Sequence, residues 1–322
     1  MSIKTTLNPS IYHGLKKKPP FFEGWYYKLI SADEKLKVAI IPGVIKGNDA
    51  HSFIQVLNGV DGKVAYHRFD FQEFKADKDR FFIKINENQF DDSRILLNIN
   101  TPEGRLSGNI TLGSLNPWPV TLTSPGIMGW YAWVPRMECY HGVLSFSHTL
   151  QGSVVLDEKP MDFSNGRGYI EKDWGMSFPD AWVWFQSNHF PESNACITAS
   201  VAIIPWLGSS FRGFIVGLWI DGKLYRFATY TGAKIESLQI SDDKVNWIIS
   251  DRNYRLVLNA TRVQGGLLLG PTHLDMGKRV LETLNATVHV RLETKSGRLL
   301  FENVGYHAGL EVIGDLPRLL HG

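Results

Sequence analysis

The chain repeats itself, and this internal duplication restricts its fold more than any other feature of the sequence. Val38–Pro42 recurs identically at Val201–Pro205, and Arg94–Asn98 is matched by Arg255–Asn259. Further matches follow in the same order along the chain, which is the pattern of two copies of one structural unit. We therefore predict an N-terminal arm over residues 1–20, a first domain over 21–176 and a second domain over 177–322.

Each copy has the pattern of antiparallel β-structure. Asn285–Leu292 alternates polar and apolar residues, as a half-buried strand does, and residues 94–100 show the same period. Asp61-Gly62, between two apolar runs, is a hairpin signal. The spacing of apolar residues over 276–284 predicts one short helix. We predict an all-β chain of two tandem lipocalin-like halves, each a small β-barrel or a strongly bent sheet.

Composition excludes several classes of partner. The chain has 322 residues, 43% of them hydrophobic, and a formal net charge of +2, so we expect no nucleic-acid partner. Lys16–Lys18 is the only basic run, and it is either a solvated part of the arm or a transient contact with a membrane surface. The sequence does not indicate an oligomeric state.

Neither a membrane span nor a disulfide is expected. No apolar run approaches the ~18 residues that cross a bilayer, and the N-terminus lacks the apolar core of a signal peptide. Cys139 and Cys196 are not part of a C-x-x-C pair, so we expect two free thiols in a reducing compartment. We therefore expect a cytoplasmic protein.

The stretch from Gly168 to Phe190 carries the most chemistry. Glu171, Lys172 and Asp173 are consecutive and are bracketed by aromatic residues. Charges held against apolar surface must be paired or shifted in pKa, and an acid in such surroundings can be tuned to protonate an apolar substrate. The simpler alternative is an ion pair between Lys172 and Asp173 at a joint between the domains.

The duplication separates architectural residues from candidates for a site. Glu23-Gly24-Trp25 is matched by Asp180-Ala181-Trp182, so we take these two segments as equivalent entries into the first strand of each copy. Features present in only one copy are better candidates, and they are the segments Tyr26–Lys28, Cys139–His141, Lys172–Trp174 and Gln186–His189. His141 and His189 are either catalytic groups or hydrogen-bonded structural histidines.

Other catalytic chemistries find no support in the sequence. His141 and His148 do not have a convincing metal-ligand spacing, and no cluster resembles a zinc site. Gln264–Gly270 lacks the lysine and the helix of a phosphate-binding loop, and no G-x-S-x-G motif is present. We expect neither a metal nor a cofactor.

Two motifs resemble the tocopherol cyclase family. Phe21–Tyr27 is similar to the family motif F-F-E-G-W-Y-F. Tyr169–Gly175, together with Phe178-Pro179 and Trp182–Phe190, resembles the block E-K-N-W-G…F-P…W-x-W-x-Q-x-N-x-F. The resemblance spans nearly the whole chain. Within the family, the chain looks like a bacterial member. One departure is Asp173, which stands where the family motif has asparagine.

The resemblance implies two lipocalin-like halves, a fold shared more distantly with carotenoid hydratases. It also implies an isomerase activity without a redox cofactor, in which a prenylated hydroquinone or a related isoprenoid lipid is closed into a chromanol. An acid protonates the alkene, the phenol oxygen attacks the tertiary cation, and a base removes its proton. Two alternatives stay open, a non-catalytic lipid carrier and a hydratase or isomerase of a polyene lipid.

We assign candidate roles on this basis. Asp173 or Glu171 is the expected acid, with Lys172 tuning its pKa. Glu23, His141 and His189 are candidates for the base or for holding the phenol. The residues expected to bind the hydrophobic ligand are Trp25, Tyr26, Tyr140, Trp174, Trp182, Trp184, Gln186 and Asn188.

Overall fold

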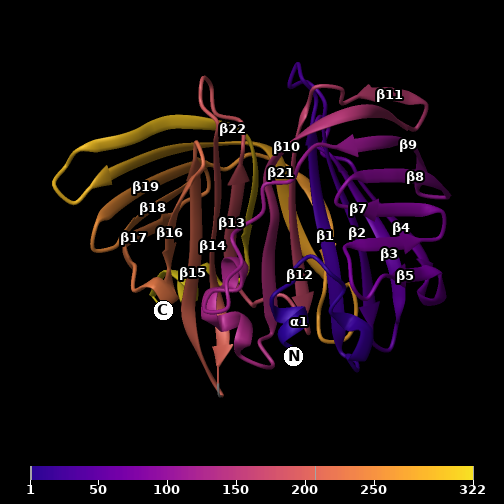
Figure 1. Ribbon diagram of the computed structural model, residues 1–322, viewed down its shortest axis with the longest axis horizontal. Coiled ribbons are helices and arrows are strands. Elements are labelled where there is room, and N and C mark those ends of the chain that lie inside the picture. The colour runs from indigo at the N-terminus through magenta and orange to yellow at the C-terminus, as the bar shows by residue number, and fades with distance from the viewer. Residues whose placement is uncertain (1, 207, 322) are drawn as a thin grey trace. The chain divides into compact units, whose positions relative to one another are not determined.

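The computed structural model describes residues 2–206 and 208–321, and antiparallel strands make up most of them (Figure 1). The predicted all-β class is confirmed. The chain forms two compact units. Unit 1 runs to Phe178 and takes in Gly266–Arg279, whereas unit 2 consists of Pro179–Gly265 and the chain from Val280 onward. The sequence-based division placed residues 266–279 in the second domain. In the structure this segment packs with unit 1 instead.

Unit 1 is one strongly bent sheet. Its strands follow the order β4-β3-β2-β1-β12-β10-β9-β8-β7-β6-β5, and β11 pairs with β10. Among the described strands, β4 and β5 are the two ends of this path, so the sheet is bent rather than closed into a barrel. The strands are β1 (Phe21–Ile30), β2 (Lys37–Lys46), β3 (His51–Asn58), β4 (Val64–Asp70), β5 (Phe74–Ala76), β6 (Phe82–Ile85), β7 (Asn88–Asp91), β8 (Arg94–Thr101), β9 (Gly104–Leu112), β10 (Cys139–Leu156), β11 (Lys159–Asp162) and β12 (Arg167–Gly175).

Short helical turns and one returning strand complete unit 1. The helical elements are α1 (Ile3–Thr6), η1 (Gly14–Lys16), η2 (Phe71–Glu73) and η3 (Gly126–Trp133). Strand β20 (Gly266–Gly270) lies against β3 and β4. There Gln55 forms two hydrogen bonds of 2.8 Å with the backbone of Leu269, one as donor and one as acceptor. These bonds hold the 266–279 segment on unit 1.

Aromatic side chains fill the interior of unit 1. Trp25 and Tyr27 project from the same face of β1 because side chains alternate along a strand. The Trp25 ring stacks on Phe81 with centroids 6.4 Å apart, and Tyr27 packs against Phe90 at 5.7 Å. Trp25, Tyr27 and Phe90 are completely buried. Burial of these large rings supplies much of the apolar area that stabilises a bent sheet of this size.

Unit 2 shares the central strand order of unit 1 and has two strands fewer along its path. Its path is β16-β15-β14-β13-β22-β21-β19-β18-β17, in which β13, β22 and β21 take the places that β1, β12 and β10 have in unit 1. The elements are β13 (Trp182–Ser187), β14 (Ala195–Trp206), β15 (Ser209–Ile220), β16 (Lys223–Ala228), η4 (Thr229–Thr231), β17 (Lys234–Ile240), β18 (Lys244–Ser250), β19 (Tyr254–Thr261), β21 (Lys278–Thr294), β22 (Leu299–Ile313) and α2 (Leu316–His321). The shared central order fits the prediction of two similar halves.

Two details of the sequence interpretation are wrong. In unit 2 the core contains Val183 and Phe185, so Trp182 lies on the opposite face of β13, whereas Trp25 lies inside unit 1. The two tryptophans are therefore not equivalent, because a shift of one residue moves a strand side chain to the other face. The helix predicted over 276–284 is instead the beginning of β21. A spacing of four residues suits one face of a strand as well as one face of a helix.

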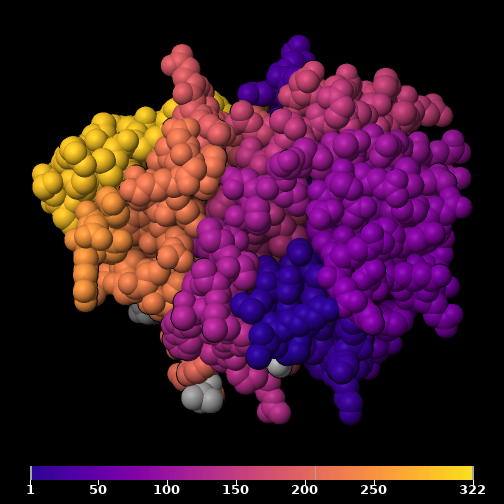
Figure 2. Space-filling model, viewed as in Figure 1, coloured from indigo at the N-terminus to yellow at the C-terminus, as the bar shows by residue number. Residues whose placement is uncertain are grey.

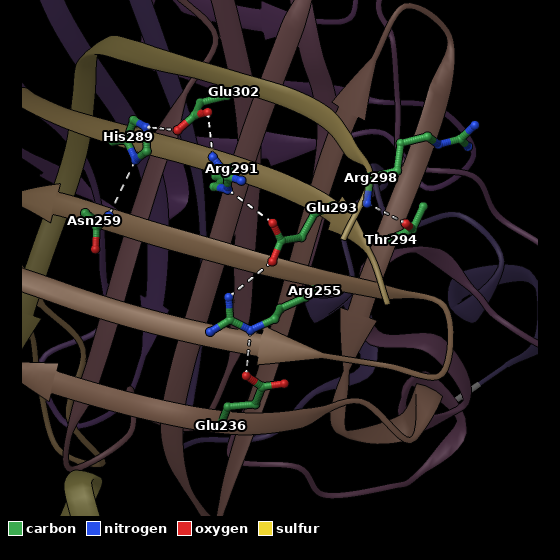
Figure 3. Close-up of polar contacts among 9 residues, drawn as sticks. All are labelled: Glu236, Arg255, Asn259, His289, Arg291, Glu293, Thr294, Arg298 and Glu302. Atoms are coloured by element: carbon green, nitrogen blue, oxygen red, sulfur yellow. Dashed lines mark hydrogen bonds and ion pairs between the residues drawn. The ribbon is translucent and has the colours of Figure 1, made fainter. Parts of the chain in front are cut away.

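The outer face of unit 2 carries a ladder of charges across four strands (Figure 3). Arg255 binds Glu236 at 2.8 Å and Glu293 at 3.3 Å. The ladder continues through Arg291, Glu302 and His289, with contacts of 2.9 to 3.2 Å. Val288, Val290 and Leu292, which alternate with these residues on β21, are buried in the core. The ladder is thus the polar side of a sheet with one apolar face.

The helices are short. In the part of the chain that the structure describes, none is long and apolar enough to cross a membrane.

Candidate active site

Strand β12 divides the three consecutive charges between the two faces of the sheet. Side chains alternate along a strand, so Glu171 and Asp173 point to one face and Lys172 to the other. We call the first side the carboxylate face, defined by Tyr169, Glu171 and Asp173, and the second the lysine face, defined by Lys172 and Trp174. The contacts of each residue, given below, agree with this division.

On the carboxylate face an imidazole lies between the two acids. Pairing of β10 with β12 places His141 directly opposite Asp173. His141 Nδ1 is 2.8 Å from Asp173 Oδ1, and His141 Nε2 is 3.6 Å from Glu171 Oε2. The hydroxyl of Tyr169 donates a hydrogen bond of 2.6 Å to Glu171 Oε2. The cluster can therefore hold and move a proton among three titratable groups.

The two acids determine the charge of the imidazole. Burial alone would lower the pKa of His141, but the carboxylates of Asp173 and Glu171 and the hydrogen bond to Asp173 raise it to about 9. The ring is therefore an imidazolium at neutral pH. Because Nδ1–H is bonded to Asp173, Nε2–H is the proton available for exchange toward Glu171 or a bound molecule.

Two neighbours complete the carboxylate face. Cys139 Sγ lies 3.9 Å from Asp173 Oδ1, and burial together with the nearby carboxylate raises the pKa of this thiol well above its usual value. Cys139 is thus a protonated thiol rather than a nucleophile. Neither Cys139 nor Cys196 is in a disulfide, as predicted. Tyr26 is paired with Glu171 across β1 and β12, which places it on the same face.

The lysine face holds a separate buried ion pair. Lys172 Nζ is 2.6 Å from Glu23 Oε1, and both side chains are completely buried. The ammonium also lies over two indole rings, 5.0 Å from the centroid of Trp25 and 4.8 Å from that of Trp174. Tyr140 stacks on Trp174 with centroids 5.6 Å apart. Burial lowers the pKa of Lys172 to about 8, against the opposing effect of Glu23.

The structure thus brings together only some of the residues that the sequence singled out. Glu171, Asp173, His141 and Tyr26 share the carboxylate face. On the lysine face lie Glu23, Trp25, Tyr140, Lys172 and Trp174. We expected Lys172 to tune the pKa of Asp173 or Glu171 directly. Lys172 instead forms an ion pair with Glu23, because neighbouring residues of a strand point in opposite directions. Tyr169 was not selected, although its place two residues before Glu171 implies a shared face.

The remaining candidates belong to unit 2. Trp182, Trp184 and Gln186 project from the face of β13 opposite the unit 2 core, and all three are buried. Trp182 Nε1 donates a hydrogen bond of 2.5 Å to Glu311. His189 Nδ1 is 2.9 Å from Asn188 Oδ1, and its backbone pairs with Tyr306. In this unit His189 is therefore held by its own neighbours.

The carboxylate face also has the donor set of a cation site. Within the described residues, one ligand atom each from His141, Glu171 and Asp173 lies within 4.8 Å of the others. Nitrogen and carboxylate oxygen donors suit a divalent transition metal. The sequence search missed this group because His141 comes from a strand far away in the chain. The short bond between Nδ1 and Asp173 leaves Nε2 as the one imidazole donor for a metal.

Comparison with known proteins connects these strands to a family. A family model described as tocopherol cyclase-like matches residues 110–314, a range that contains β10 and β12. The chain is 25% identical over 211 residues to the probable chloroplastic tocopherol cyclase of Oryza sativa subsp. japonica, and 25% identical over 199 residues to the chloroplastic tocopherol cyclase of Zea mays. These alignments cover 61% and 58% of the chain but only 44% and 41% of the relatives. The chain thus spans less than half the length of the curated relatives that it matches.

A solved structure shares the fold. The kievitone hydratase of Nectria haematococca superimposes with a TM-score of 0.52 at 13% sequence identity, and the match covers 94% of both chains. At this identity the likeness concerns the fold alone. It agrees with the prediction of two lipocalin-like halves.

Proposed function

Since the chain belongs to the tocopherol cyclase-like family, we propose that it is an acid–base enzyme that closes a ring on a prenylated quinol or a related isoprenoid lipid. The observation that carries the proposal is the His141 imidazolium between Asp173 and Glu171, with contacts of 2.8 and 3.6 Å. A proton-loaded cluster with two carboxylates supplies both the acid and the base that such a reaction needs.

The reaction balances without a further reactant. A proton adds to one carbon of the trisubstituted alkene, and the tertiary carbon becomes cationic. The phenol oxygen attacks this carbon and loses its own proton, so the product is an isomer of the substrate. The protein needs only to deliver one proton, to shield the cation from water and to take one proton back.

Glu171 is the proposed proton donor. A neutral carboxylic acid is a stronger acid than an imidazolium with a pKa of about 9, so the carboxyl group is better suited to protonate an alkene. Transfer of the Nε2 proton from His141 to Glu171 converts an ion pair into two neutral groups. A hydrophobic substrate that excludes water favours this transfer, because low polarity disfavours separated charges.

Asp173 and Tyr169 are proposed to orient the reacting groups. The Asp173 carboxylate fixes the imidazole through Nδ1, which leaves Nε2 directed toward Glu171. Asparagine, which the family motif has at this position, can accept the same hydrogen bond without the charge. The Tyr169 hydroxyl holds one oxygen of Glu171. Tyr26, on the same face, is placed to offer an aromatic ring to a carbocation.

The test uses a short-chain prenyl hydroquinone, heavy water and mass spectrometry. The proposal predicts a chromanol with one non-exchangeable deuterium, formed by the purified protein and lost in Glu171→Gln. A deuterated product that has gained water would assign a hydratase instead. Tight binding without turnover would contradict the enzymatic proposal and favour a lipid carrier. Glu138→Gln is a suitable control, because Glu138 contacts His273 at 3.0 Å rather than His141.

A further inference from the structure

We propose that the N-terminal arm, residues 2–20, is clasped by Glu23 and Lys172, and that this clasp positions β12 so that Glu171 faces His141. The clasp itself is a structural inference, and its effect on catalysis rests on the proposed function. Lys172 is then a positioning residue, since it acts on the site through the strand that it shares with the two acids.

Three atoms of the arm bind the lysine. The Lys172 ammonium donates to the backbone oxygens of Pro9 at 2.9 Å and Ile11 at 2.5 Å, and it lies 2.9 Å from His13 Nδ1. Glu23 Oε1, at 2.6 Å, is the fourth acceptor in reach. An ammonium has three N–H groups. Its hydrogen-bonding capacity is thus directed to the arm and to one carboxylate.

The carboxylate binds the same part of the arm. The backbone N–H of His13 donates to both oxygens of Glu23, at 2.9 and 3.1 Å. The His13 ring stacks on Trp174 with centroids 4.3 Å apart and an angle of 10° between the planes. Its Nε2 is 3.0 Å from the backbone oxygen of Thr5. Side chains of the adjacent strands β1 and β12 on the lysine face therefore hold residues 9–13 together.

The arm also packs directly beside the proposed catalytic strand. A Cβ atom on Gly142, the residue after His141, would lie 3.3 Å from Pro9 Cβ and 3.3 Å from Trp174 Cζ3. Glycine thus allows the arm to approach β10 closely at this point. Figure 2 shows the indigo arm on the surface of unit 1, next to the magenta segment that contains η3. A Cβ atom on Gly126, the first residue of η3, would lie 3.7 Å from Pro9 Cγ.

Charge burial makes the clasp cooperative. Both Lys172 and Glu23 are completely buried, and a buried charge needs partners to replace the water that it has lost. The backbone groups of the arm supply these partners, so the ion pair and the seated arm require each other. Because Glu171 and Asp173 flank Lys172 in the same strand, any rotation of β12 about its axis moves both acids relative to His141.

The test removes both charges together. Glu23→Leu with Lys172→Met leaves no unpaired charge in the interior. Hydrogen exchange of the arm amides, His13 above all, should become at least tenfold faster. Hydrogen exchange of the β12 amides from Glu171 to Asp173 should become faster as well, because the strand loses the partner that fixes Lys172. On the lipid substrate, kcat should fall at least tenfold while KM changes less than threefold.

Lys46→Met is the matched control. Lys46 also binds the arm, through the backbone oxygens of Gly14 at 2.5 Å and Lys17 at 3.3 Å, but it lies on β2. This variant should speed exchange near residues 14–17 and leave the exchange of the β12 amides and kcat unchanged. If the double variant does not fold by circular dichroism, His13→Ala carries the same readouts, since it introduces no buried charge.

Unchanged exchange of the β12 amides and unchanged kcat in a folded double variant with a released arm would overturn the proposal. So would arm amides that exchange as slowly as in the wild type. Exchange of the arm amides and of the β12 amides is measured without substrate. If the wild type turns over no isoprenoid lipid, the proposed function fails while these two readouts still decide whether the clasp positions the cluster.

Discussion

Asp173→Asn tests the electrostatics of the cluster. The substitution removes one negative charge and keeps an oxygen that can accept the hydrogen bond from His141 Nδ1, now 2.8 Å from Asp173 Oδ1. The two side chains have nearly the same size, so the packing of β12 against β10 should persist. The effect that remains is the loss of charge beside the imidazolium.

The size of the effect follows from the pKa of His141. The difference between the ordinary value of 6.5 and about 9 corresponds to about 3 kcal/mol of preference for the protonated ring. Asp173 contributes more to this preference than Glu171 does, and it also makes the hydrogen bond. Asparagine keeps the hydrogen bond in a neutral form, so the variant loses mainly the coulombic attraction of Asp173, which is the largest contribution that raises the pKa of His141. We therefore expect Asp173→Asn to move the pKa of His141 most of the way back to 6.5.

The sign of the stability change with pH follows from the same shift. The pKa of His141 in the folded protein lies above its unfolded value, so its contribution is fully present below pH 6.5. The contribution is lost as the pH rises through 9. The wild type should therefore exceed Asp173→Asn in stability by about 1.5–3 kcal/mol at pH 6, and this difference should shrink above pH 9.

Two assays measure these quantities. NMR titration of the histidine ring protons, with His141→Gln used to assign the resonance, gives the pKa directly. Urea unfolding of both proteins at pH 6 and pH 9.5 gives the difference in free energy, in which titrations shared by both proteins cancel. A His141 pKa below 7 in the wild type would refute the reasoning. So would a stability difference that does not depend on pH.

Further predictions concern the metal donors, the charge ladder and the aromatic interior. Added Zn²⁺ should inhibit turnover at pH 7 by competing for Nε2 of His141, and chelation should restore the rate. Binding of Zn²⁺ to His141→Gln as tight as to the wild type would contradict this assignment. Arg255→Met should lower the unfolding free energy by less than about 1 kcal/mol, with an effect that shrinks in high salt and no change in turnover, because the ladder is on the surface. Trp25→Ala should cost about 3–5 kcal/mol in urea unfolding, since the buried ring stacks on Phe81. A loss below 1 kcal/mol would mean that the interior collapses around the missing ring.

Local periodicity was sufficient to predict the class of fold. Asn285–Leu292 alternates so regularly that no element other than a strand fits it, and it lies within β21. The repeat implied two similar halves, and the two units share the central part of their strand order. It misaligned Trp25 with Trp182 by one residue, because short matches of aromatic residues do not define which face of a strand each ring takes.

The candidate site was only partly within reach of the sequence. Residues 171–173 could be recognised in the sequence as the source of both acids. Alternation of side chains along a strand would also have placed Lys172 on the face opposite Glu171 and Asp173. The position of His141 opposite Asp173 depends on the register between β10 and β12, which local patterns do not encode. The sequence predicted the arm but not its binding to Lys172, for a different reason. Lys172 binds backbone oxygens of Pro9 and Ile11, and a backbone acceptor leaves no residue signature.

The central claim is that Glu171 delivers the proton to the substrate alkene, and deuterium transfer tests it most directly. Wild type, Glu171→Gln and Asp173→Asn are each incubated with a prenyl hydroquinone in heavy water under single-turnover conditions. The account predicts one carbon-bound deuterium in the wild-type product, a slower reaction with the same label in Asp173→Asn, and no product in Glu171→Gln. Formation of the labelled chromanol by Glu171→Gln at the wild-type rate would contradict it.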